Sequence, residues 1–154
     1  MPTDVFETVN TLVKEELGLY RSLEELVDDE EQMVRQSDME GLLEVLQHKQ
    51  SIISRQEFLL EKWNSISASL GVQDGGREGP AFWNSLAARI GESGYNQIVT
   101  GINEIRELGQ KLLDREGEIR AALEENLAEM RGTLLKMGRN RLAMRGYSQG
   151  MTAY

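Results

Sequence analysis

The most restrictive feature of this 154-residue sequence is a long run of positions spaced alternately four and three residues apart. Eight of the twelve positions are apolar, which is the pattern of a helix that packs lengthwise against other helices. The positions are Ile98, Ile102, Ile105, Gly109, Leu112, Glu116, Ile119, Leu123, Asn126, Met130, Thr133 and Met137. Forty residues of helix span roughly 60 Å, which is too long for a compact globule to cover. The sequence therefore predicts an elongated molecule with long helices side by side.

Two further apolar runs, at about 4–35 and 38–70, predict the helices that accompany the first one. Only a few residues separate these runs. They include a capping box in which Ser37 is expected to accept a hydrogen bond from the amide of Glu40. So short a break between two long helices predicts an antiparallel hairpin over residues 4–70.

Glycine-rich breaks divide the rest of the chain. Residues 71–79 predict a loop, residues 80–90 a short helix that docks onto the hairpin, and residues 96–130 the long third helix. Residues 1–130 are therefore expected to form an all-α, elongated antiparallel bundle of three long helices plus one short helix. All 26 acidic side chains lie in this part, whereas residues 131–154 hold five basic side chains and four glycines. The last segment is expected to be a flexible, basic, amphipathic C-terminal tail.

Few residues are available for catalysis or for binding metal. The chain has no cysteine and one histidine, His48, which excludes catalytic triads and histidine-rich metal sites. Lys49 follows His48 directly, whereas phosphotransfer bundles place a lysine three positions after their histidine, so we interpret His48 as an ordinary boundary residue. Glu16, Glu30 and Glu116 interrupt the apolar rows. We favour a role in helix register, or a place near water at the bundle ends, over metal ligation.

The overall composition restricts the partners of the chain. A net charge of −9 repels phosphate backbones, so nucleic-acid binding is not expected. No run of eighteen apolar residues is present, so stable membrane insertion is not expected either. The start of the chain is acidic where a secretory signal is basic, and cysteine is absent, which suits the cytoplasm. We expect no enzyme activity and no cofactor.

The helical period of the third helix continues into the basic tail, whose apolar positions are the expected site for binding another protein. These positions are Leu127, Met130, Leu134, Met137, Leu142, Met144 and Tyr147. The basic side chains expected to support binding are Lys136, Arg139, Arg141 and Arg145. Methionine is used in cores as well as on adaptable binding surfaces, so Met137 and Met144 fit either role.

Two segments of the chain carry a distinctive order of residues. The first runs from Leu26 to Leu42 (LVDDEEQMVRQSDMEGL) and is followed by a lysine and an isoleucine pair. The second is Leu123-Glu-Glu-Asn126-Leu127, with a leucine pair beyond it and the ending Tyr-Ser-Gln-Gly. They are similar to the first hairpin and the C-terminal helix of the FlgN-type flagellar export chaperones, and the chain resembles that family over most of its length.

The resemblance implies a cytoplasmic, non-enzymatic chaperone of the flagellar type III export system. Such a chaperone binds the C-terminal helical segments of hook–filament junction proteins (FlgK and FlgL), prevents their premature association and presents them to the export gate. The resemblance also implies that Asn126 opens the substrate-binding segment. Two other interpretations remain open. One is a structural coiled-coil adaptor or homo-oligomerising bundle, and the other is a phosphotransfer or regulatory bundle.

Overall fold

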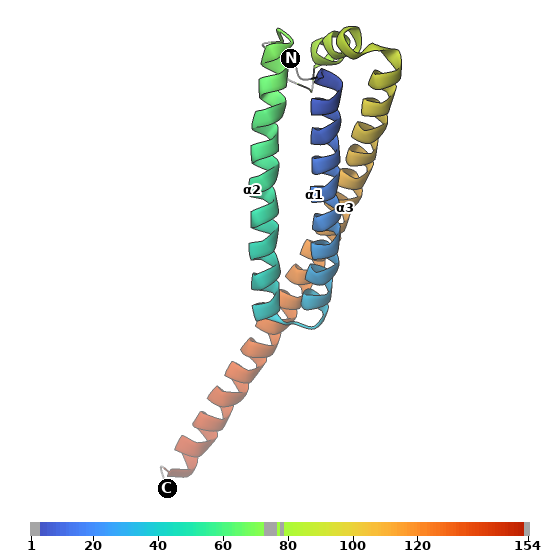
Figure 1. Ribbon diagram of the computed structural model, residues 1–154. Coiled ribbons are helices and arrows are strands. Elements are labelled where there is room, and N and C mark those ends of the chain that lie inside the picture. Colours follow the sequence, from blue (N-terminus) through green and yellow to red (C-terminus); the bar gives the residue numbers. More distant parts are fainter. Residues whose placement is uncertain (1–3, 73–76, 78, 153–154) are drawn as a thin grey trace.

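The protein is built from three long helices, as a computed structural model shows (Figure 1). The structure describes the backbone of residues 4–72, 77 and 79–152, and side chains as far as Arg139. The helices are α1 (Val5–Arg35), α2 (Met39–Ser69) and α3 (Pro80–Thr152), and no strand occurs in the described part. The predicted all-α class is confirmed. No described helix has a stretch long and apolar enough to cross a membrane.

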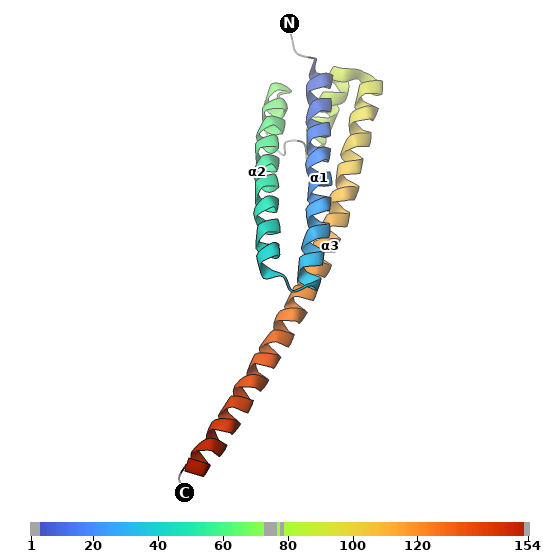
Figure 2. The same ribbon diagram turned by 60° about the horizontal axis from the view of Figure 1, so that its bottom comes forward.

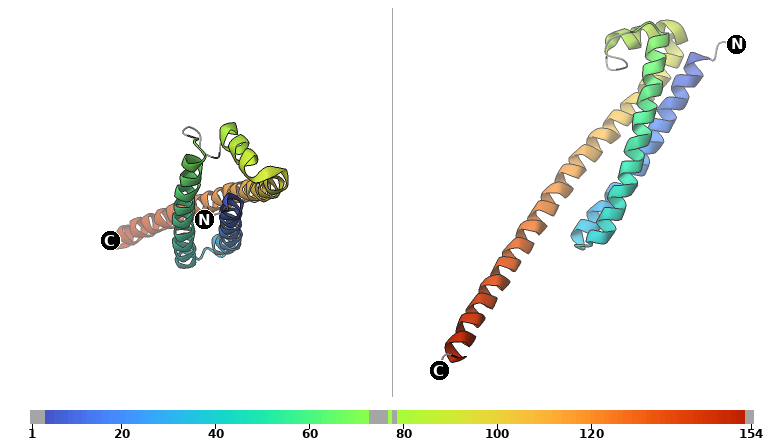
Figure 3. Two further views of the ribbon diagram at one scale, coloured as in Figure 1. Left: turned by 45° about the horizontal axis from the view of Figure 1, so that its top comes forward. Right: turned by 90° about the vertical axis from the view of Figure 1, so that its left-hand side faces the viewer.

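The short helix predicted at residues 80–90 does not stand as a separate element, because this helical segment is joined to the rest of α3 and forms its beginning. Its junction with the rest of α3 is a kink at Gly91, whose φ of 83° and ψ of 169° are non-helical. Glycine adopts a positive φ without steric cost, so a single residue redirects the chain and helix resumes at once. The break expected between residues 90 and 96 is therefore reduced to one residue, and the start of α3 lies across the end of the bundle (Figures 1 and 3).

Helix α1 is the central element of the bundle and packs against both α2 and α3 (Figures 1 and 3). Close approaches between α2 and α3 are far fewer. Along α1 the buried apolar side chains fall into two clusters. The cluster near the kink contains Val9, Leu12, Val13, Leu59, Trp63, Phe82, Leu86, Ile98, Ile102 and Ile105. The cluster near the hairpin turn contains Val27, Val34, Leu42, Leu112 and Ile119.

The hairpin turn between α1 and α2 does not use the predicted capping box. Ser37 has a φ of 53°, in the left-handed region, and its amide donates to the Val34 carbonyl at 3.2 Å. The amide of Asp38 donates to the Met33 carbonyl at 2.9 Å, which completes a Schellman motif at the end of α1. The residue that caps α2 is Asp38, whose carboxylate accepts from the Gly41 amide at 2.9 Å. Ser37 ends one helix instead of starting the next.

The glutamates that interrupt the apolar rows form ion pairs between elements of the bundle. Lys49 of α2 pairs with Glu30 of α1 at 2.8 Å and also with Glu116 of α3, so one lysine links all three helices. Glu16 is buried in α1 and accepts two hydrogen bonds from the Arg77 guanidinium, at 2.5 and 2.7 Å. Lys49 joins positions on three helices and so helps to fix their register, whereas Arg77 ties the connection between α2 and α3 to α1. No cluster of metal-binding side chains occurs among the described residues.

Candidate protein-binding site

Helix α3 runs on beyond the hairpin, and we call its residues 127–152 the extension (Figure 2). The hairpin turn lies at residues 36–38, so neither α1 nor α2 accompanies the extension. At the point of departure the Asn126 side-chain nitrogen donates to the Val34 carbonyl at 2.9 Å. The Val34 carbonyl also accepts from the Ser37 amide, so the Asn126 bond is a second one to this oxygen and ties α3 to the turn. The structure therefore gives Asn126 a structural contact, and its predicted role in binding a partner stays a prediction.

Four side chains of the extension continue the apolar spacing of α3 and are exposed. Leu127, Met130, Leu134 and Met137 have 38%, 49%, 64% and 48% of their surfaces exposed, and we call them the extension seam. Leu135 is exposed too, but it lies about 100° round the helix from Leu134 and outside the seam. A row of large apolar side chains that no described element covers is a candidate surface for binding another protein.

A small pocket lies where the extension meets the hairpin turn. It has a volume of about 330 Å³. Its lining residues are Ser37, Asn126, Glu129, Met130, Thr133 and Leu134. Sequence patterns could not identify Ser37, Glu129 or Thr133 as lining residues, because only the fold brings the turn beside the base of the extension. The pocket offers a partner side chain a place beside Met130 and Leu134, with polar groups at its rim.

The basic residues of the extension lie beside the seam. Arg131, Lys136 and Arg139 are exposed, and none of them has an ion pair in the described part of the chain. Arg141, Leu142, Met144, Arg145 and Tyr147 belong to the helical backbone of α3, but their side chains lie outside the described residues. Their predicted roles, and the predicted flexibility of residues 131–154, stay predictions.

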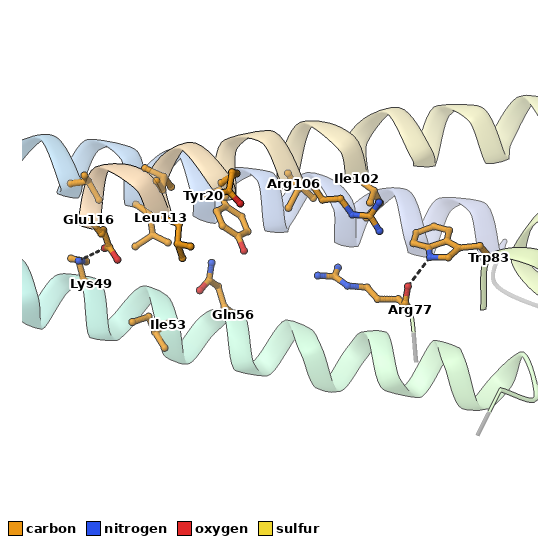
Figure 4. Close-up of a pocket in the computed structure, with 16 residues that line it drawn as sticks. Tyr20, Lys49, Ile53, Gln56, Arg77, Trp83, Ile102, Arg106, Leu113 and Glu116 are labelled. Atoms are coloured by element: carbon orange, nitrogen blue, oxygen red, sulfur yellow. Dashed lines mark hydrogen bonds and ion pairs between the residues drawn. The ribbon is translucent and has the colours of Figure 1, made fainter. Parts of the chain in front are cut away.

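A second and larger concavity, of about 680 Å³, lies between α2 and α3, and we call it the α2–α3 groove (Figure 4). No pattern in the sequence predicts this groove. The Lys49–Glu116 ion pair lies at one end (Figure 4). At the other end the Trp83 indole nitrogen donates to the Arg77 carbonyl at 2.7 Å. Between these ends Ile53 of α2 and Leu113 of α3 line the groove.

Two titratable groups in the groove have shifted pKa values. Burial opposes the positive charge of Lys49, but the hydrogen bonds that Lys49 donates to Glu116 and Glu30 outweigh that effect and raise its pKa. Burial, followed by the negative charge of Glu16, raises the pKa of Tyr20. Lysine and tyrosine already titrate near pH 10, so Lys49 stays charged and Tyr20 stays neutral near pH 7. The groove thus offers a cation, a phenol and apolar walls, which suits binding better than acid–base catalysis.

Comparison with known proteins supplies one match. A family model with the description "FlgN protein" matches residues 1–154, which is the whole chain. No curated protein and no solved structure matches the sequence.

Proposed function

The chain belongs to the FlgN family of flagellar export chaperones, and from that premise we propose that its clients are hook–filament junction proteins of the FlgK and FlgL type. It binds their C-terminal helical segments in the cytoplasm and prevents their premature association. It then delivers them to the type III export gate without catalysing a reaction. The observation that carries this proposal is the extension seam, a row of exposed apolar side chains on a part of α3 that neither α1 nor α2 accompanies.

The chemistry of the seam fits a helical client. An amphipathic helix lies along such a row with side chains spaced three and four residues apart, so both helices bury their apolar faces. Each aliphatic side chain that becomes fully buried contributes about 1.5–3 kcal/mol. The exposed basic groups Arg131, Lys136 and Arg139 add about 0–1 kcal/mol for each surface ion pair. Apolar contact therefore supplies most of the affinity.

The same surface accounts for release of the client. Nothing lies within 4 Å of a Cβ atom at Gly132 or Gly138 of the extension, and these two glycines lower its helix propensity by about 1 kcal/mol each relative to alanine. Ordering a weakly held helix on binding consumes part of the contact energy, so the complex stays moderate in affinity. A chaperone that must hand its client to an export gate needs such a reversible complex.

The proposal is tested on the client. Purified full-length junction protein should bind the chain with one-to-one stoichiometry in isothermal titration calorimetry. A junction protein that lacks its C-terminal helical segment should show no heat of binding. Equal binding by both forms would contradict the proposed client segment. Light scattering of the chain alone provides the control, because a homo-oligomer that covers its own seam would show mass growing with concentration and would contradict the chaperone role.

A further inference from the structure

The exposed face of α2 indicates that the α2–α3 groove is an unfilled helix position. Four apolar side chains at seven-residue intervals, namely Met39, Leu46, Ile53 and Leu60, are exposed along α2. Residues seven apart lie on nearly the same helix face, and Ile53 of this row lines the groove. Because α1 already covers the buried face of α2, this second row has no partner among the described residues.

The opposite wall of the groove continues into the extension seam. Leu113 of α3 lines the groove and has 68% of its surface exposed. Residues at seven-residue intervals beyond it are Arg120, Leu127 and Leu134, and the last two belong to the seam. A helix that lies on the seam and continues along α3 therefore reaches Leu113 and the α2–α3 groove. The two surfaces form one track along α3.

The charged side chains along this track restrict which helix can bind there. Arg106 lines the groove and has no ion pair in the described structure, whereas Lys49 and Arg77 are paired with glutamates. Arg120 follows on the same row and is exposed without an ion pair among the described residues. On α2 the exposed Glu57, which does not line the groove, lies in sequence between Ile53 and Leu60. An occupant with carboxylates on the side that faces α3 satisfies both arginines, whereas the basic extension of a second copy brings like charges together.

We propose that the α2–α3 groove binds an acidic amphipathic helix of the client, continuous with the segment held by the extension seam, and that this helix completes a four-helix bundle. The proposal rests on the proposed function and adds a second contact surface for the same client. The client helix places apolar side chains between Ile53 and Leu113 and carboxylates toward Arg106 and Arg120.

The floor of the groove supplies a means of selecting the client. Tyr20 of α1 and Gln56 of α2 point into the groove (Figure 4), and neither side chain has a hydrogen-bond partner in the described structure. A client side chain that enters the groove with a polar end satisfies these groups, whereas a purely apolar one leaves them unpaired and desolvated. The floor therefore favours a long side chain with a polar tip at this point of the client helix.

The test compares matched substitutions in the full-length chain, with purified full-length junction protein as the probe in calorimetry. Leu113→Glu should weaken binding by about tenfold to hundredfold, since it places a charge at the centre of the interface. Phe58→Glu makes the same change at an exposed position that does not line the groove, and it should leave the affinity unchanged. Arg106→Glu should weaken binding more at low salt than at high salt. Circular dichroism should give wild-type helix content for all three variants, because these side chains are exposed.

The outcomes separate this proposal from the proposed function. If Leu113→Glu and Phe58→Glu both bind the junction protein as the wild type does, the groove proposal is wrong and the extension seam remains the site. If the wild type does not bind the junction protein, both proposals fail. A wild-type dimer that becomes a monomer on Leu113→Glu would show that a second copy occupies the groove, and it would also overturn the proposal.

Discussion

The two halves of α3 carry one apolar spacing and have different surroundings. Ile102, Ile105 and Ile119 lie in the bundle and are each 5% exposed, whereas the extension seam is 38–64% exposed. The cause is length. Beyond the kink at Gly91 helix α3 continues for about 60 residues to Thr152, and α1 and α2 have 31 each, which at 1.5 Å per residue is about 90 Å against about 46 Å. The spacing of apolar residues therefore defines the apolar face of a helix. The helices that pack beside it decide whether that face becomes core or stays exposed for binding.

The largest difference is expected between two substitutions of an aliphatic residue by aspartate, one in each half of α3. Ile119→Asp places a carboxylate in the cluster near the hairpin turn and should lower the free energy of unfolding by about 4 kcal/mol or more. Leu134→Asp makes the same kind of change in the extension and should lower it by less than about 0.5 kcal/mol. Urea denaturation followed by circular dichroism measures both values. Similar losses in the two variants would mean that the extension seam is also core.

The second largest effect is expected from the ion pairs of Lys49, which join α1, α2 and α3. Lys49→Met leaves Glu30 without its cation, and both side chains are only 12% exposed, so unfolding should become easier by about 3 kcal/mol. The raised pKa of Lys49 makes this contribution complete below lysine's ordinary pKa of 10.5. The contribution is lost as pH rises through the raised value. The stability difference between wild type and variant should therefore shrink above about pH 10.5. A difference that stays constant from pH 8 to 12 would rule out this role for Lys49.

The smallest expected changes in stability come from substitutions at two glycines of α3. A Cβ atom at Gly101 would lie 2.5 Å from Val13 Cγ1 of α1, so Gly101→Ala should cost about 1–2 kcal/mol through overpacking. Nothing lies within 4 Å of a Cβ atom at Gly117, which is the matched control. Gly117→Ala should instead stabilise the protein by about 0.5–1 kcal/mol through helix propensity. Thermal melts of the two variants should move in opposite directions, and a gain in both would contradict the close approach of α1 and α3 at Gly101.

Sequence periodicity could predict the all-α class and the core face of α3, because burial repeats with the helical turn. It could not predict the kink at Gly91. Gly91 and Gly94 look alike in sequence, and only the first has a positive φ. The sequence also predicted Ser37 as the cap of α2. Ser37 and Asp38 are both good capping residues, and the Schellman motif at the end of α1 leaves this role to Asp38.

The helical period also predicts part of the candidate site. Leu127, Met130, Leu134 and Met137 follow the helical period, so they could be identified without coordinates. The α2–α3 groove depends on how far α2 and α3 lie apart, and no local pattern encodes that distance. Arg77 is the clearest example, since it lies 61 residues from its partner Glu16.

The central claim is that the extension seam binds the client and does not stabilise the bundle. The most direct measurement is the affinity of the Leu134→Asp/Met137→Asp variant for full-length junction protein, taken together with its melting temperature. Leu135→Asp, at an exposed position off the seam, is the control and should bind as the wild type does. The double variant should lose binding and keep a wild-type melting temperature and helix content. Wild-type affinity in the double variant, or a fall in its melting temperature, would contradict the account.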